Sequence, residues 1–270
     1  MSDIPHLSNL AISLKNGVAV LKYNRPEVGN ALSVPMIEDI LSGFKWAQDQ
    51  DEVRVILQTG VGRFFTTGLD LKDKSVTGPG TVISDAFLNT MRELHKIMIN
   101  SNKVLVTAVN GPAPGWGTTS LALADLVYAS PNAVFFTPFV QLGIAAEACS
   151  TVTFSKIMGH QKAASLLLAG ERMTATELEN LGLVTKVLPK ECFLENVLKI
   201  CYRIASQPPE ALELNKKLLM RNSRQELLSA NETELKFLRE RARSHESRSA
   251  VNVFLLDQGR KKQEKTEAKL

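Results

Sequence analysis

The stretch NGPAPGWGTT, residues 110–119, follows the run VLVTAV, residues 104–109, and the two together decide the class of fold. Six apolar or β-branched residues that end at an Asn-Gly-Pro turn are typical of a buried strand. Gly115 and Gly117 allow the backbone to approach other atoms closely, and the apolar residues beyond them predict a helix at 121–125. A strand that passes through a glycine-rich turn into a helix indicates an α/β fold.

Strands and helices also alternate on the N-terminal side of this stretch. Alternating apolar residues at 10–14 and 18–20 predict two strands joined by an Asn-Gly hairpin turn. Apolar residues at helical spacing then follow Ser33, a good N-cap, with Pro35 in the first turn. Further short strands are expected at 53–57, 126–129 and 134–136. This alternation predicts parallel strands with right-handed crossovers.

The chain changes character after about residue 200, where helical patterns replace strands. Pro208-Pro209 opens a helix with Ala211, Leu214 and Leu218 on one face, a charged helix is expected around 232–243, and an amphipathic segment at 250–256. We therefore predict a spiral core at 1–200, a C-terminal helical region at 201–258 and a flexible basic tail at 259–270.

Composition excludes several classes of protein. The chain has 270 residues, 44% of them hydrophobic and 22% charged, which suits a globular protein with a sizeable core. No apolar run is long enough to span a membrane, and the first ten residues do not resemble a signal peptide. The net charge of +4 lies mostly in the tail at 260–265, without interleaved aromatic residues, so we expect no nucleic-acid partner. Three cysteines and four histidines show no metal-binding spacing, so no metal is expected and a reducing compartment is favoured.

Three segments could carry chemistry. The first is RFFTTGLD, residues 63–70, which is either an ordinary polar turn or a loop that offers a backbone N–H to an anionic oxygen. The second is residues 110–119, where a close-packed turn and an anion-binding turn are equally consistent with the sequence, and a dinucleotide site is a poor match. The third is residues 138–149, in which Glu147 is a lone acid among small and apolar residues. Such an acid either serves as a general base with a raised pKa or lies at a helix N-terminus.

These segments, in this order, resemble the crotonase (enoyl-CoA hydratase/isomerase) superfamily over most of the chain. The matching motifs are Asn24-Arg25-Pro26, Asn30-Ala31-Leu32, Gly68-Leu69-Asp70, Asn110-Gly111-Pro112-Ala113, Leu142-Gly143, the segment 163–170 with Ala175, and Gly182-Leu183-Val184. Residues 246–256 resemble the family's C-terminal helix. The resemblance implies an α/β fold built as a crotonase-like spiral of β-β-α units, with a C-terminal helical trimerisation region. It also implies a homotrimer or hexamer.

The resemblance further implies an acyl-CoA substrate whose thioester oxygen lies between the backbone N–H groups of Leu69 and Trp116, an oxyanion hole. The family usually has alanine and often glycine at these positions, so the bulk of both residues is expected to shape the acyl pocket. The same matching assigns these residues to substrate binding: Ala31, Thr66, Thr67, Gly68, Asp70, Leu71, Gly115 and Phe139.

The acidic residues indicate the subfamily. Hydratases of this superfamily carry two glutamates, at positions that Thr119 and Phe139 occupy here. Dienoyl-CoA isomerases keep an acid at the Phe139 position and an aspartate at the Glu147 position. Δ3,Δ2-enoyl-CoA isomerases use one glutamate, at the Glu147 position. The resemblance therefore implies that catalytic Glu147 moves a proton from C2 to C4 of a 3-enoyl-CoA in fatty-acid β-oxidation, without a cofactor because CoA is part of the substrate.

The C-terminal tripeptide Ala268-Lys269-Leu270 resembles the S-K-L address, which implies recognition by the peroxisomal import receptor and a peroxisomal location. Two alternatives for the function remain open. One is another crotonase-type enzyme that acts on an unusual acyl-CoA in secondary metabolism, which substrate profiling would distinguish. The other is a non-catalytic acyl-CoA-binding homologue, which measurable turnover would exclude.

Overall fold

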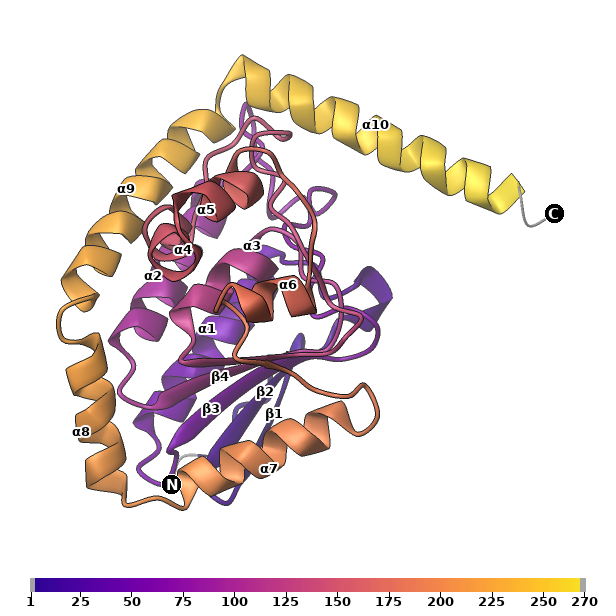
Figure 1. The fold of residues 1–270 in the computed structure, drawn as a ribbon. Helices are drawn as coiled ribbons and strands as arrows, with labels where there is room; N and C mark the ends of the chain where they lie inside the picture. Colours follow the sequence, from indigo (N-terminus) through magenta and orange to yellow (C-terminus); the bar gives the residue numbers. More distant parts are fainter. Residues whose placement is uncertain (1–2, 268–270) are drawn as a thin grey trace.

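A six-stranded sheet forms the centre of the structure (Figure 1). The structure is a computed structural model that describes residues 3–267, with side chains described through residue 260. In spatial order its strands are β1 (Leu10–Lys15), β2 (Val18–Tyr23), β3 (Val55–Gly60), β4 (Val104–Val109), β5 (Leu126–Ala129) and β8 (Lys186–Val187). β1 is antiparallel to β2 and every other pair is parallel, with Val55 opposite Val104 in the register. The predicted α/β class is confirmed.

Local sequence signals determine the start of the fold. Asn16 and Gly17 both have positive φ, of 50° and 75°, which the primed turns of tight hairpins require, so the predicted hairpin is confirmed. Ser33 caps α1 (Val34–Asp49) by accepting a hydrogen bond from the backbone N–H of Met36 at 3.4 Å, with Pro35 in the first turn. This predicted cap is also confirmed.

Helices cover both faces of the sheet. Ile56 of β3 and its neighbours on one face pack against α1 and α2 (Asp85–Asn100). Val55 and Leu57, on the opposite face, pack against α7 (Phe193–Ala205). Because parallel strands are buried on both faces, they appear in the sequence as continuous apolar runs.

A second, smaller layer of structure lies beyond β5. It contains the two-stranded sheet of β6 (Val134–Phe135) and β7 (Met173–Thr174), with helices α4 (Ser150–Met158), α5 (His160–Leu167) and α6 (Ala175–Asn180). The short 3-10 helix η1 (Pro26–Val28) precedes α1. The helix predicted at 121–125 is wrong. Gly115, with φ of 59°, turns the chain directly into α3 (Trp116–Thr119), and a 3-10 helix, η2 (Ser120–Leu123), completes the segment.

Three helices form the C-terminal region, as predicted: α8 (Pro209–Met220), α9 (Arg224–Ala242) and α10 (His245–Glu267). α9 packs along α2 and α4, whereas α10 extends away from the body of the molecule (Figure 1). Because α10 runs to Glu267, the helix is longer than the segment predicted at 250–256, and the tripeptide at 268–270 lies outside the described residues. Within residues 3–267, no helix combines the length and apolar character needed to cross a bilayer.

Candidate active site

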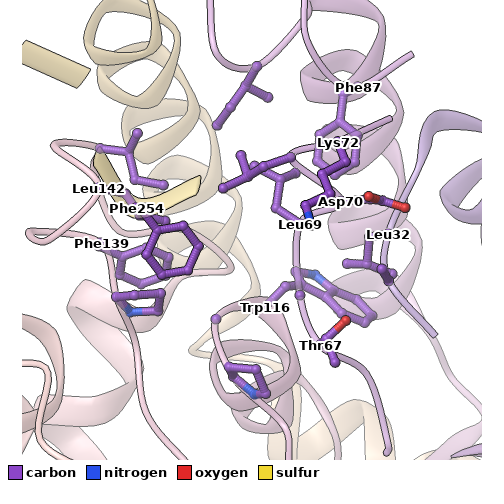
Figure 2. Close-up of a pocket in the computed structure, with 18 of the residues that line it drawn as sticks. Leu32, Thr67, Leu69, Asp70, Lys72, Phe87, Trp116, Phe139, Leu142 and Phe254 are labelled. Carbon is purple, nitrogen blue, oxygen red and sulfur yellow. The ribbon is translucent and has the colours of Figure 1, made fainter. Parts of the chain in front are cut away.

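A cavity of about 500 Å³ opens between the loops that follow β3 and β4, the segment before α4, and helices α2, α9 and α10. Figure 2 shows Phe139, Leu142 and Phe254 on one side of it and Leu69, Trp116 and Leu32 on the other. Of the eleven predicted site residues, ten line this cavity: Ala31, Thr67, Gly68, Leu69, Asp70, Leu71, Gly115, Trp116, Phe139 and Glu147. The three segments singled out in the sequence are therefore brought together.

Thr66 is the predicted site residue that does not line the cavity. It is fully buried, and its hydroxyl donates to the carbonyl of Asn30 at 2.7 Å and accepts from the N–H of Gly68 at 3.1 Å. Thr66 therefore supports the loop that carries Leu69, from beneath.

Close backbone contact holds the two glycine-rich loops together. A Cβ atom on Gly68, where φ is 77°, would lie 3.1 Å from the carbonyl oxygen of Pro114. A Cβ atom on Gly111 would lie only 2.0 Å from the carbonyl oxygen of Arg63. The side chain of Asn110 crosses between the loops, accepting from Gly60 N–H and donating to the carbonyl of Gly62, both at 3.0 Å. The glycines of both motifs are thus explained by backbone proximity.

Two backbone N–H groups at this junction have no protein acceptor. Across residues 3–267, neither the amide of Leu69 nor that of Trp116 donates a hydrogen bond, although both residues line the cavity. Neighbouring amides are used: Gly68 N–H bonds to Thr66, and Gly117 N–H bonds to the carbonyl of Pro114 at 3.2 Å. Buried N–H groups normally find an acceptor, so the pair is available to an anionic oxygen in the cavity.

Glu147 reaches this cavity from the loop before α4, and only 4% of its surface is exposed. The hydroxyl of Thr119 donates to its Oε1 at 2.5 Å, while its Oε2 has no hydrogen-bond partner. Burial raises the pKa of Glu147 to about 8, against a smaller opposing effect of the Thr119 hydrogen bond. A carboxylate in such surroundings binds a proton strongly and can act as a general base.

The alternative role of Glu147 as an acid at a helix N-terminus does not hold. Glu234 of α9 fills that role, accepting from Cys149 N–H at 2.7 Å and from Thr151 N–H at 3.0 Å at the start of α4. The two residues after Glu147, Ala148 and Cys149, both have positive φ, of 56° and 60°. Non-glycine residues rarely adopt this conformation, so packing and the Glu234 contacts must hold the turn that aims Glu147 at the cavity.

Sequence reasoning missed His95, which is fully buried on α2 with its Nε2 3.6 Å from Oε2 of Glu147. The available signal was its position four residues after Met91 and eight after Phe87, which places it on the apolar face of α2 that borders the cavity. The sequence marked Thr119 only as a position where hydratases carry a glutamate. In the structure its hydroxyl orients the carboxyl group of Glu147.

Apolar side chains form most of the rest of the cavity wall. They are Leu32, Ile83, Phe87, Met91, Phe139, Leu142, Ile144, Leu238, Phe254 and Leu255. Lys72 and Asp70 also line the cavity, and Asp70 lies 3.6 Å from Arg25. A cavity with an apolar wall and a few convergent polar groups suits an extended ligand with one polar reacting centre. Within the described part of the chain, no three His, Cys, Asp or Glu residues converge as metal ligands would.

The sequence is similar to those of known enzymes. The chain is 37% identical to enoyl-CoA delta isomerase 2 of Rattus norvegicus over 247 residues, which cover 91% of this chain and 63% of that protein. It is 35% identical to peroxisomal enoyl-CoA delta isomerase 3 of Mus musculus over 256 residues, which cover 94% of this chain and 80% of that protein. The chain thus spans about 63% of the length of the rat and human isomerase 2 proteins.

A solved structure shares the fold. The crystal structure of an enoyl-CoA hydratase/isomerase from Pseudoalteromonas atlantica superposes with a TM-score of 0.85 and 31% sequence identity, covering 93% of this chain and 98% of that one. The sequence profile described as enoyl-CoA hydratase/isomerase matches residues 13–263. These matches confirm the resemblance found in the motifs, and the chain belongs to the enoyl-CoA hydratase/isomerase family, the crotonase superfamily.

Proposed function

We propose that the protein is a Δ3,Δ2-enoyl-CoA isomerase that converts 3-enoyl-CoA thioesters to 2-trans-enoyl-CoA. The observation that carries the proposal is Glu147, a buried carboxyl group with one free oxygen, in the same cavity as the unpartnered amides of Leu69 and Trp116. The delta isomerases of rat and mouse, named for such an activity, are among its relatives.

In the proposed reaction, the thioester oxygen accepts hydrogen bonds from the amides of Leu69 and Trp116. Glu147 removes a proton from C2, and the electron pair moves onto this oxygen as an enolate. One positioned donor of this kind typically contributes about 2.7–4 kcal/mol to stabilisation of the transition state. The protonated Glu147 then delivers the proton to C4, and the double bond forms between C2 and C3. No cofactor enters this scheme, because CoA is part of the substrate.

A single acid suits isomerisation better than hydration. Addition of water needs one group to activate the water and another to manage the substrate proton. Thr119 and Phe139 stand where the two glutamates of a hydratase are expected, and Phe139 adds an apolar wall to the cavity. We therefore expect hydration of 2-enoyl-CoA to be much slower than isomerisation.

The decisive experiment assays 3-cis- and 3-trans-enoyl-CoAs of several chain lengths with the wild-type protein and Glu147→Gln. Loss of the only base should reduce turnover by about 10²–10⁴-fold or more while leaving acyl-CoA binding near normal. Thr90→Val, on the exposed side of α2, is a matched control that should keep full activity. A Glu147→Gln protein with most of its turnover, or hydration as fast as isomerisation, would exclude the proposed mechanism.

We also propose that the protein works in the peroxisome. The tripeptide at 268–270 and the peroxisomal isomerase 3 of mouse support this location. A fluorescent fusion with a free C-terminus should enter peroxisomes, and removal of Ala268–Leu270 should leave it in the cytosol. An intact fusion that stays in the cytosol would contradict the proposal.

A further inference from the structure

A chain of buried hydrogen bonds links the candidate oxyanion residue Trp116 to helix α9. The indole Nε1–H of Trp116 donates to Nε2 of His95 at 3.0 Å, and Nδ1 of His95 lies 2.8 Å from Oδ1 of Asn231. All three side chains are buried. The amide of Asn231 is oriented by a further bond, from its Nδ2 to the carbonyl of Arg92 at 3.3 Å.

These partners determine which ring nitrogen of His95 carries the proton. An indole N–H is only a donor, so Nε2 must present its lone pair to Trp116. The carbonyl oxygen of Asn231 is only an acceptor, so Nδ1 must carry a hydrogen. A protonated ring would bring two donors together at Nε2, and burial lowers the pKa of His95 to about 4. His95 is therefore held neutral, with the proton on Nδ1.

This tautomer has a consequence for Glu147. Oε2 of Glu147 lies 3.6 Å from Nε2 of His95, which would be an ion pair only if both ring nitrogens carried a proton. In the neutral Nδ1–H tautomer, Nε2 carries no hydrogen, and its lone pair accepts the hydrogen bond from the Trp116 indole. Nε2 therefore has no hydrogen to donate to Oε2 of Glu147. If His95 carried its proton on Nε2, it could donate to Oε2, stabilise the carboxylate and weaken it as a base.

We infer that His95 is a positioning residue of the isomerase site: Trp116 and Asn231 hold its ring as the neutral Nδ1–H tautomer, which leaves the second oxygen of Glu147 free for the substrate proton. The same hydrogen bond anchors the indole of Trp116, whose amide faces the cavity. The inference rests on the proposed function, because it concerns the strength of the base that the isomerisation needs.

Other titratable groups also surround this carboxyl in the described part of the chain. Glu234 approaches from α9, and its negative charge raises the pKa of Glu147 further. Cys149 lies two residues from Glu147, and burial keeps its thiol protonated by raising its pKa. Neither group supplies a hydrogen to Oε2, and neither side chain forms a hydrogen bond with the Trp116 indole or the His95 ring.

The tautomer can be tested without an activity assay. In protein labelled with ¹⁵N-histidine, the ring of His95 should show a protonated Nδ1 and an unprotonated Nε2 that do not titrate between about pH 5 and 9. The signals are assigned by their loss in His95→Gln. A ring with the proton on Nε2, or one that titrates near the ordinary histidine pKa of about 6.5, would overturn the inference.

The consequence for catalysis is tested with Trp116→Phe, which removes the indole N–H and keeps the backbone amide. Without that donor, Nε2 of His95 can take up a proton and donate to Glu147. The midpoint of the pH profile of kcat/KM should then fall by about 1–3 units. A merely structural role would lower turnover without moving the midpoint. Trp46→Phe, the same change at the only other tryptophan, on α1, should leave the midpoint where it is.

The outcomes separate this inference from the proposed function. If wild-type protein does not isomerise 3-enoyl-CoA, the proposed function fails, whatever the histidine spectrum shows. If it does isomerise but the Trp116→Phe midpoint equals that of the wild type, the inference alone fails. If Trp116→Phe does not fold, the spectrum of the wild-type ring still decides.

Discussion

The carboxyl group of Glu147 keeps its proton to higher pH than an exposed glutamate, because burial disfavours the carboxylate and Oε2 has no donor. The same surroundings make its carboxylate a strong base once it forms. A base of this kind must be deprotonated before it can act, so the pH dependence of kcat/KM should report its pKa in the free enzyme.

We therefore predict that kcat/KM rises with pH and levels off above about 8, the pKa of Glu147. Below that pH the active carboxylate fraction falls by about tenfold per unit, and kcat/KM should fall with it. The measurement is a pH series of initial rates at substrate concentrations well below KM. A profile that is already flat at pH 6 to 7, as the ordinary pKa of about 4.3 requires, would contradict the raised pKa.

The same pKa predicts a dependence of stability on pH. The folded-state pKa of about 8 lies above the ordinary glutamate pKa of about 4.3, so between these pH values the unfolded chain loses this proton and the folded chain keeps it. The free energy of unfolding should therefore decrease as pH rises across this window, by up to about 1.4 kcal/mol per unit, and level off above it.

Glu147→Gln removes the titrating group and is the reference for this measurement. The difference in unfolding free energy between Glu147→Gln and wild type should grow from pH 5 to 8 in favour of the variant, as measured by denaturant unfolding. A constant difference across the series would show that Glu147 titrates alike in both states.

The sequence identified the residues of the site whose role depends on a local motif. Leu69, Trp116 and Glu147 each lie in a motif, and the structure brings all three to one cavity, although their catalytic roles remain predictions. His95 and Asn231 were not predictable in this way, because they meet across 136 residues of sequence. The spacing of His95 from Phe87 and Met91 places it on the apolar face of α2, but does not distinguish it from an ordinary buried residue of that face.

Among the elements, the loop after β4 depends most strictly on one residue. Gly111 packs its Cα against the carbonyl oxygen of Arg63, and an added Cβ atom would lie 2.0 Å from that oxygen. The loops that carry Leu69 and Trp116 meet at this junction, so any shift here separates the two candidate oxyanion donors.

We predict that Gly111→Ala lowers the free energy of unfolding by about 1–3 kcal/mol or more and reduces turnover. Gly259→Ala is the control, because Gly259 lies within α10 and a Cβ atom there would meet no atom within 4 Å. That change should be neutral or stabilise by up to about 1 kcal/mol. Denaturant unfolding and initial rates measure both effects. Equal stability of Gly111→Ala and wild type would show that the junction yields easily.

Elements were predictable where the chemistry that forms them is local. The hairpin follows from the Asn-Gly turn, and the start of α1 follows from Ser33 and Pro35. β7 and β8 have two residues each, too few to show a periodic pattern, and tertiary pairing alone defines them. The helix expected at 121–125 begins at Trp116 instead, because Gly115 adopts a conformation that the sequence does not specify.

At the scale of the whole molecule, the C-terminal region leaves apolar surface uncovered. α8 turns Leu214, Leu218 and Leu219 outward, with 57%, 55% and 77% of their surface exposed. The inward side of α8 carries Leu212 and Met220, which pack against the core, and Lys216, which is buried and pairs with Asp125 at 2.5 Å. Three leucines that a helix turns outward indicate a contact with another chain. α10, which extends from the body, also exposes Val253 and Leu256 (Figure 1).

We predict that the protein forms a homotrimer, or a hexamer made of two trimers, through this C-terminal region. Light scattering should give a mass of three or six times the 29.7 kDa of one chain. The double substitution Leu214→Glu and Leu218→Glu places charges on the exposed face of α8 without touching its buried pair, so it should weaken assembly and yield smaller species. Ile4→Glu introduces the same charge at an exposed apolar residue, 46% accessible, ahead of β1 and should leave the mass unchanged. A wild-type protein that is monomeric at micromolar concentration would contradict the prediction. A double variant that assembles as fully as Ile4→Glu would place the interface elsewhere, with α10 the next helix to test.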